Sequence, residues 1–297
     1  MSPPRLSGRR TLAAALLALG LVATPRPARA QPREVSLDRG PTSELYVRKR
    51  PPAPVAPVLA DELQRLLTDA TRARDEKRLG AIALLREFLA GDPEGPVRAD
   101  GMFKLAELLW EEARRTYLVA MDDYERALEA CKQATTPCSE PPAEPRIALG
   151  ESEALYRELL AAFPDYRRAD LVRYLIGFAA KEGGREAEAM AQFQAVIERY
   201  PQSPLYGDAW MMVGEHHFAA AEWAKAREAY EHILGDPAAA TYDLALFKSA
   251  WCDWKLGDPD KAALRFKEVL DLAVEAQRSG TAAQQRRRAG LRDEALE

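Results

Sequence analysis

Histidine and cysteine are scarce in this chain, with three of each in 297 residues. Two of the histidines follow a glutamate, in the run Glu215, His216 and His217. A zinc-protease helix needs two histidines four residues apart, whereas adjacent histidines point about 100° apart on a helix. His217 is therefore interpreted as a hydrogen-bonded core residue. Glycine-rich phosphate loops, nucleophile elbows and serine-triad spacings are also missing. We expect no enzyme activity, no metal site and no cofactor.

The chain also has no apolar run long enough to cross a bilayer. Residues 11–23 form an apolar run of thirteen residues, and a spanning helix needs about 20. This run follows Arg9 and Arg10 and precedes the small-x-small sequence that ends at Ala30, which is the order of a secretory signal peptide. We predict a signal peptide over residues 1–30, cleaved after Ala30, and a periplasmic protein. General secretion and the twin-arginine route both stay open.

Positive charge is limited once the signal peptide is removed. Residues 1–30 hold five arginines and no acid, so 42 basic residues less these five leave 37 against 46 acidic residues, a net charge of −9. Phosphate binding needs a concentrated positive surface, so no nucleic-acid partner is expected. The basic clusters 48–50 and 286–288 are interpreted as solvated charges on a linker and on a helix.

What the chain does have is a repeat. Ala189 and Phe193 recur 37 residues later as Ala226 and Tyr230, and 36 residues after that as Ala262 and Phe266. A small residue upstream recurs at the same interval, as Gly177, Gly214 and Ala250. A period of this length marks a stack of antiparallel helix pairs, in which a first helix A crosses a second helix B. The small residues are predicted to lie at the crossing, with Gly177 facing Ala189, Gly214 facing Ala226 and Ala250 facing Ala262. Pro201 and Pro237 are predicted to end helix B, because proline cannot continue a helix.

These residues resemble the tetratricopeptide repeat (TPR) family over residues 150–272. The segment 246–263 is especially similar to repeats of bacterial envelope proteins, such as the Tol–Pal accessory protein, the outer-membrane-assembly lipoprotein and gliding-motility proteins. The resemblance implies an all-α, right-handed solenoid of antiparallel helix pairs. It also implies a scaffold that binds a protein or peptide partner.

The rest of the chain is predicted to extend this solenoid. Residues 31–58 are a proline-rich linker, and residues 59–149 form degenerate N-terminal repeats with a proline-rich insertion at 133–149. Ala81, Leu85, Phe88 and Pro93 show a weak helix-B pattern, and residues 99–132 form one long helical stretch whose last part, 117–132, is either a separate helix or an extension. Regular repeats occupy 150–274. A last helix within 275–297 is either a cap or helix A of a further repeat.

Two of the cysteines flank the proline-rich insertion. Cys131 and Cys138 have six residues between them, and in an oxidising compartment such a pair tends to form a disulfide. We predict this disulfide, with two free thiols as the alternative. Cys252 is interpreted as a small buried apolar residue.

The family resemblance implies which residues line the partner-binding groove. They lie on helix A at positions −3, +1 and +4 from the crossing residue, where aromatic side chains favour recognition. The nine residues are Tyr174, Phe178, Lys181, Met211, Glu215, Phe218, Phe247, Trp251 and Trp254.

The sequence therefore predicts a non-catalytic periplasmic scaffold that binds a protein or peptide in a cell-envelope complex. By resemblance this complex is Tol–Pal-like, an outer-membrane assembly machine, or a motility or secretion apparatus. Two alternatives stay open: a self-associating structural protein, and a regulatory accessory of a cell-wall enzyme.

Overall fold

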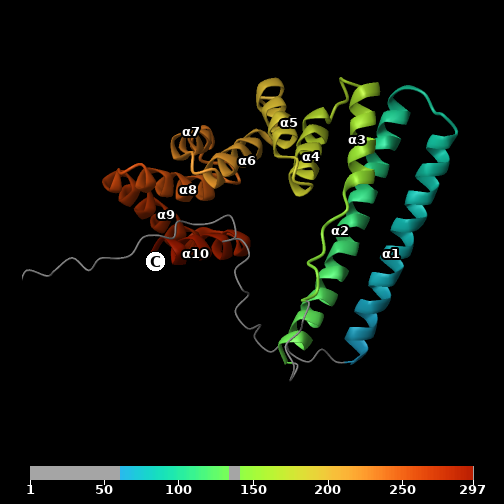
Figure 1. The fold of residues 1–297 in the computed structure, drawn as a ribbon, viewed down its shortest axis with the longest axis horizontal. Coiled ribbons are helices and arrows are strands. Elements are labelled where there is room, and N and C mark those ends of the chain that lie inside the picture. The colour runs from blue at the N-terminus through green and yellow to red at the C-terminus, as the bar shows by residue number, and fades with distance from the viewer. Residues whose placement is uncertain (1–60, 134–140, 297) are drawn as a thin grey trace, which may run out of the picture. The chain divides into compact units, whose positions relative to one another are not determined.

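The computed structural model describes residues 61–133 and 141–296, and these ranges contain ten α-helices and no β-strand (Figure 1). Each helix packs against the next along the series, which confirms the prediction of an all-α stack of helix pairs. The predicted signal peptide, the predicted linker and Cys138 fall outside the described residues. The helices are α1 (Asp61–Ala90), α2 (Gly95–Gln133), α3 (Gly150–Ala162), α4 (Ala169–Glu182), α5 (Glu186–Arg199), α6 (Tyr206–Ala219), α7 (Trp223–Leu234), α8 (Tyr242–Lys255), α9 (Pro259–Ser279) and α10 (Ala282–Leu296).

Three pairs share one turn between helix A and helix B. The turns follow α4, α6 and α8, and each has a left-handed residue at the same place: Gly184 (φ 71°), Ala221 (φ 58°) and Gly257 (φ 83°). In each turn the next amide donates to a carbonyl five residues back, as Glu222 does to His217 at 2.9 Å. This is the Schellman motif, which satisfies carbonyls left over at a helix end. The repeat therefore extends to the backbone geometry of the turns.

A ring on helix B closes each crossing. A Cβ on Gly177 would lie 2.9 Å from Phe193 Cε1, and one on Gly214 only 2.3 Å from Tyr230 Cε1. The nearest contact of each glycine is therefore with the ring, and the prediction that Gly177 faces Ala189 and Gly214 faces Ala226 stays a prediction. The aromatic ring four residues beyond the alanine occupies the space that a glycine Cβ would take. The alanines are buried small residues on the same helix.

An additional unit is formed by α2 and α3. Tyr156 of α3 lies 37 residues before Phe193 and is fully buried, as a helix-B ring should be. Ser152 Oγ of α3 donates to the carbonyl oxygen of Ala106 in α2 at 2.8 Å, and Ala106 is also fully buried. Ala106 is therefore the crossing residue of this unit. The rest of α2 and the segment that follows it form an insertion between its helix A and helix B.

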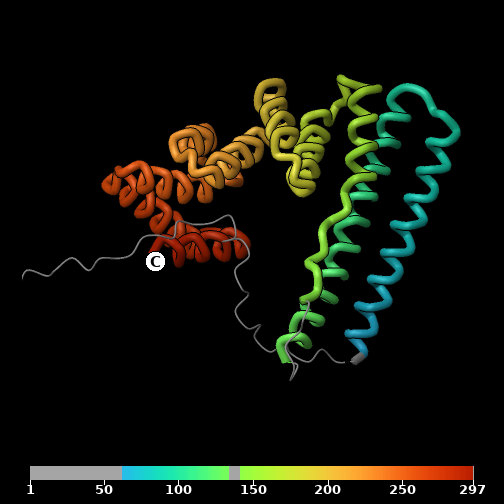
Figure 2. The backbone as a smooth tube through the Cα atoms, viewed as in Figure 1, coloured from blue at the N-terminus to red at the C-terminus, as the bar shows by residue number. Residues whose placement is uncertain are grey.

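The long helix α2 is continuous over 39 residues, so residues 117–132 extend it and form no separate helix. Figure 2 traces α2 along its length and the segment 141–149 that leads into α3 without helical structure. Antiparallel to α2 runs α1, held by two ion pairs: Asp75 with Arg115 at 2.6 Å and Arg78 with Glu112 at 2.7 Å. Hydrogen bonds from Arg115 hold the pKa of Asp75 at about 2. The insertion and α1 thus make a two-helix hairpin.

At the other end, α10 packs on α8 and α9. Leu291 of α10 is buried against Leu246, Phe247 and Val269. Arg287 and Arg288 donate to the buried carboxylate of Asp243 in α8 at 2.7 and 2.8 Å. Both predicted roles for this helix, a cap and a further helix A, are compatible with this packing.

Candidate protein-binding face

The crossing residues place an equivalent surface on four helices. We call it the A-helix face: positions −3, +1 and +4 from Ala106 on α2, Gly177 on α4, Gly214 on α6 and Ala250 on α8. Neighbouring A helices touch through this face, because Trp110 packs against Phe178 with ring centroids 5.8 Å apart. The nine predicted residues lie on the helices expected. They differ in burial: some are buried and the others keep part of their surface exposed.

Three of the nine predicted partner residues are too buried to contact a partner. Met211, Phe218 and Phe247 are 6%, 5% and 2% exposed. Met211 and Phe247 occupy position −3, where the next unit covers them: Met211 lies in the core with Ala245 of α8, and Phe247 packs against Leu291 of α10. Phe218 packs edge-on against Trp223. These three side chains pack between helices and do not belong to the candidate site.

Tyr174 also serves mainly in packing. Its ring lies 5.4 Å from that of Phe193, and burial raises the pKa of the Tyr174 hydroxyl to about 12. The ring therefore stays neutral at physiological pH and adds an apolar wall beside α5. This again follows from position −3, which faces the adjacent helices.

The residues that keep a half-exposed surface are at +1 and +4. They are Phe178 and Lys181 on α4, Glu215 on α6, and Trp251 and Trp254 on α8. Trp251 is held by edge contacts with Phe247 and Phe266, with centroids 6.4 and 5.5 Å away. Its indole Nε1 is buried and has no hydrogen-bond partner in the structure. An aromatic ring fixed by its neighbours loses little entropy on binding, which suits it to recognition.

Glu215 is fixed in place by two neighbours. Tyr230 donates its hydroxyl to Glu215 Oε1 at 2.7 Å, and Lys248 of α8 donates Nζ to Oε2 at 3.0 Å. Lys248 is almost wholly buried, and its Nζ lies 4.6 Å above the ring of Phe218. The carboxylate thus ties α6 to α8, and its charge is paired with that of Lys248.

The sequence analysis missed the part of this face on α2. Trp110 and Glu107 stand at +4 and +1 from Ala106, and both are half-buried. The insertion hid them, because it separates Ala106 from Ser152 and so breaks the A-to-B spacing. A usable signal was present: Leu85 to Ala106 is 21 residues, the same as Phe193 to Gly214.

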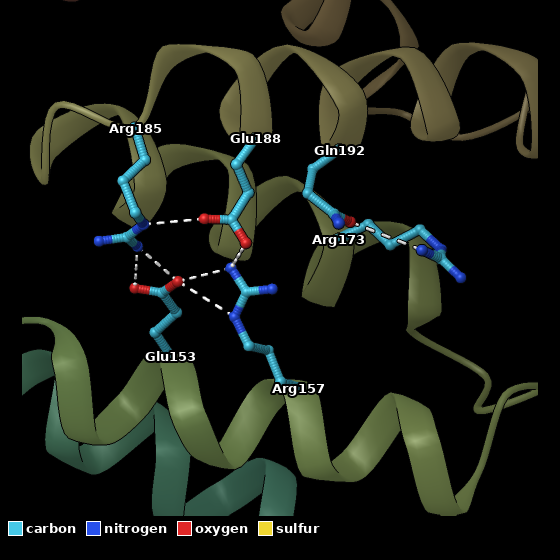
Figure 3. Close-up of polar contacts among 6 residues, drawn as sticks. All are labelled: Glu153, Arg157, Arg173, Arg185, Glu188 and Gln192. Atoms are coloured by element: carbon cyan, nitrogen blue, oxygen red, sulfur yellow. Dashed lines mark hydrogen bonds and ion pairs between the residues drawn. The ribbon is translucent and has the colours of Figure 1, made fainter.

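A group of charged side chains joins α3 to α5. Glu153 of α3 accepts from Arg157 and from Arg185 at 2.6 Å each, and Glu188 of α5 accepts from the same two arginines (Figure 3). The arginines bridge two carboxylates, so α3 is fastened to the start of α5. The nearby Arg173 reaches Gln192 at 3.5 Å.

His217 and Cys252 are held by the fold, one by a hydrogen bond and the other by burial. His217 Nδ1 lies 2.6 Å from Glu222 Oε2 across the α6–α7 turn, so it is hydrogen-bonded as predicted, but it is half-exposed at a turn and lies outside the core. Cys252 is a buried free thiol whose pKa is raised to about 12 by burial. Cys131 lies near the end of α2 and is disulfide-bonded. Its pairing with Cys138, which lies outside the described residues, stays a prediction.

In the described ranges no group of three or more His, Cys, Asp and Glu residues could hold a metal ion. None of the helices described is both long enough and apolar enough to cross a membrane.

A comparison with protein families agrees with the helix pairs. The tetratricopeptide repeat model matches residues 172–203 and 244–273. These stretches cover most of α4 with α5 and of α8 with α9. The chain therefore contains tetratricopeptide repeats, an architecture that serves as a scaffold for protein–protein interaction.

Proposed function

We propose that this protein is a scaffold whose A-helix face binds an extended or helical segment of a partner protein. The observation that carries the proposal is the set of half-buried aromatic rings on three of the four A helices, namely Trp110 on α2, Phe178 on α4, and Trp251 and Trp254 on α8. Fixed aromatic side chains are the residues that most often dominate binding energy at interfaces. Lys181 supplies a positive charge and the Glu215–Lys248 ion pair a polar group beside them, which fits a partner with apolar anchors flanked by polar residues.

The test is site-specific photo-crosslinking in cells. A photoreactive residue at Trp254 or at Phe178 should capture a discrete partner, and one at Leu264 should not. Leu264 is a matched control because it is 68% exposed but lies on α9, a B helix. Capture at Leu264 alone would contradict the proposal.

The affinity for the captured partner gives a second measurement. Trp254→Ala and Phe178→Ala should each weaken binding by roughly tenfold or more, the effect of truncating an interface anchor. Leu264→Ala should leave the affinity unchanged. All three side chains are partly or largely exposed, so melting temperatures should stay close to that of the unchanged protein.

We further propose that the scaffold works in the bacterial periplasm, as part of a cell-envelope complex. Support comes from the sequence of residues 1–30, with its arginines, short apolar run and Ala28-Arg29-Ala30 site. The similarity of its repeat to those of Tol–Pal, outer-membrane-assembly and motility proteins favours the same compartment. N-terminal sequencing should find a mature chain that begins at Gln31 in the periplasmic fraction. An intact N-terminus in the cytosol would overturn this assignment.

A further inference from the structure

The helix α1 exposes far more apolar surface than a solenoid helix should. Leu63, Leu66 and Leu84 are 44%, 61% and 68% exposed, and Leu67 is also exposed. On the side of α1 that faces α2, by contrast, the apolar side chain of Ile82 is buried. Apolar side chains gathered on one exposed face mark a surface that another element covers.

Leu63, Leu66 and Leu84 fall on the spacing of a coiled coil. Positions 63, 66, 70, 73, 77, 80 and 84 alternate steps of three and four, which is the a/d pattern of a heptad repeat. The residues in this stripe, which we call the α1 stripe, are Leu63, Leu66, Ala70, Ala73, Lys77, Gly80 and Leu84. They lie on a different side of α1 from Asp75, Arg78 and Ile82, which face α2.

The repeat register explains why this stripe is uncovered. Ala81, Leu85 and Pro93 have the spacing of Ala189, Phe193 and Pro201, so α1 is a helix B. In the regular units the crossing residue of helix A lies 16 residues before the ring, as Gly177 does before Phe193. Sixteen residues before Leu85 is Asp69, which is inside the continuous helix α1. Within the described residues α1 therefore continues through the place of its own helix A, and no described helix covers the stripe.

The charges beside the stripe select the occupant and its direction. Glu62, Asp69 and Glu76 line one edge, and Arg74 lies on the other. Two parallel copies of α1 would bring Asp69 of each beside Arg74 of its partner, whereas antiparallel copies would place the acidic edges together. Opposite charges at these flanking positions set partner and orientation in coiled coils. Lys77 stands at a core position, where a single polar residue fixes the register.

We propose that the α1 stripe is a dimer interface, at which α1 forms a parallel two-stranded coiled coil with α1 of a second copy of this chain. The dimer buries the exposed leucines and leaves the A-helix faces of both copies available. It is independent of the partner-binding face, so either proposal can fail without the other.

The first test measures the mass of the purified protein, as its host makes it, by light scattering after size exclusion. The expected mass is twice that of one chain, and Leu66→Glu should reduce it to that of one chain. The matched control is Leu79→Glu, because Leu79 is 51% exposed on α1 but lies off the stripe. A monomeric unchanged protein, or equal dissociation by both variants, would overturn the proposal.

The second test measures direction. Ala73→Cys places a thiol at a core position of the stripe, where a parallel coil brings both copies together, so oxidation should cross-link the dimer in high yield. Arg72→Cys is the control, since the Arg72 side chain is 68% exposed and points away from the stripe. Equal cross-linking at both positions, or none at Ala73→Cys in a dimeric protein, would contradict the parallel coil.

Discussion

At two helix crossings an aromatic ring lies so close to a glycine that a larger residue would not fit. Gly214 is the tightest case, because a Cβ there would lie 2.3 Å from Tyr230 Cε1. We predict that Gly214→Ala lowers the free energy of unfolding by about 1–3 kcal/mol, the usual cost of overpacking a core. The same change at Gly290 in α10 meets no atom within 4 Å and should stabilise by up to about 1 kcal/mol. Urea denaturation measures both, and equal effects would contradict the crossing geometry.

A second residue-scale constraint is the left-handed turn residue. Glycine occupies this place in two of the three turns, but Ala221 holds φ 58° in the third. An L-residue with a Cβ pays roughly 1–2 kcal/mol in this conformation. We predict that Ala221→Gly raises the melting temperature by a few degrees. Gly257→Ala, at φ 83°, should lower it, and the opposite result for either variant would refute the shared turn.

The pH dependence of α1 packing depends on Asp75. Hydrogen bonds from Arg115 lower its pKa from 3.8 to about 2, so the folded state favours the carboxylate. A lowered pKa stabilises the fold above the unfolded value, and this contribution is lost as pH falls from about 4 to about 2. We predict that Asp75→Asn flattens the acid side of the stability curve in this window. The control Glu87→Gln, exposed on the same helix, should leave its slope unchanged in melts followed by circular dichroism.

Between elements, a buried carboxylate joins three helices. Asp253 of α8 is fully buried and pairs with Arg227 of α7 at 2.9 Å and with Arg265 of α9 at 3.2 Å. Removing one member of a buried ion network leaves the others uncompensated. We predict that Asp253→Ala lowers the free energy of unfolding on the order of 3 kcal/mol. Glu228→Ala, at an exposed site on α7, should change it by less than about 0.5 kcal/mol.

At the same scale, helix pairs were predictable because their signals are local. The proline stop and the turn lie within one unit, and the interval of 36 or 37 residues links adjacent units, so α4 to α9 could be placed from sequence. Ala106 and Tyr156 could not be paired, since the insertion places these two residues of one unit 50 positions apart in the sequence. Burial of Met211 and Phe247 depends on the next unit, and a pattern within one repeat does not reveal how much of a side chain its neighbour covers.

The candidate site shows the same division. The helix and face of Phe178, Trp251 and Trp254 follow from the crossing residues alone. Whether a side chain at position −3 or +4 stays available depends on packing between units, so Phe218 was predicted at the surface although Trp223 and Lys248 cover it. Ion pairs such as Glu215 with Lys248 join residues 33 positions apart and leave no pattern in a charge-rich sequence.

Over the whole molecule, each helix pair packs against the next one. Stability in such arrays is carried by interfaces between neighbours. The helix α10 is the last cover in the described chain, and it offers both an apolar residue, Leu291, and two arginines that neutralise the buried Asp243. Its removal therefore acts on α8 and α9 in two physically different ways.

Deletion of α10 after Gly280 tests this coupling. The shortened protein should expose Phe247 and leave Asp243 without Arg287 and Arg288, so we predict a melt that begins at lower temperature and aggregation through the α8–α9 surface. Leu291→Ala should reproduce the apolar part, at about 2–4 kcal/mol, and Arg288→Ala the ionic part. Far-ultraviolet circular dichroism with light scattering measures both. An unchanged melt and a soluble product after deletion would show that α8 and α9 are stable without their neighbour, contrary to the nearest-neighbour account of this fold.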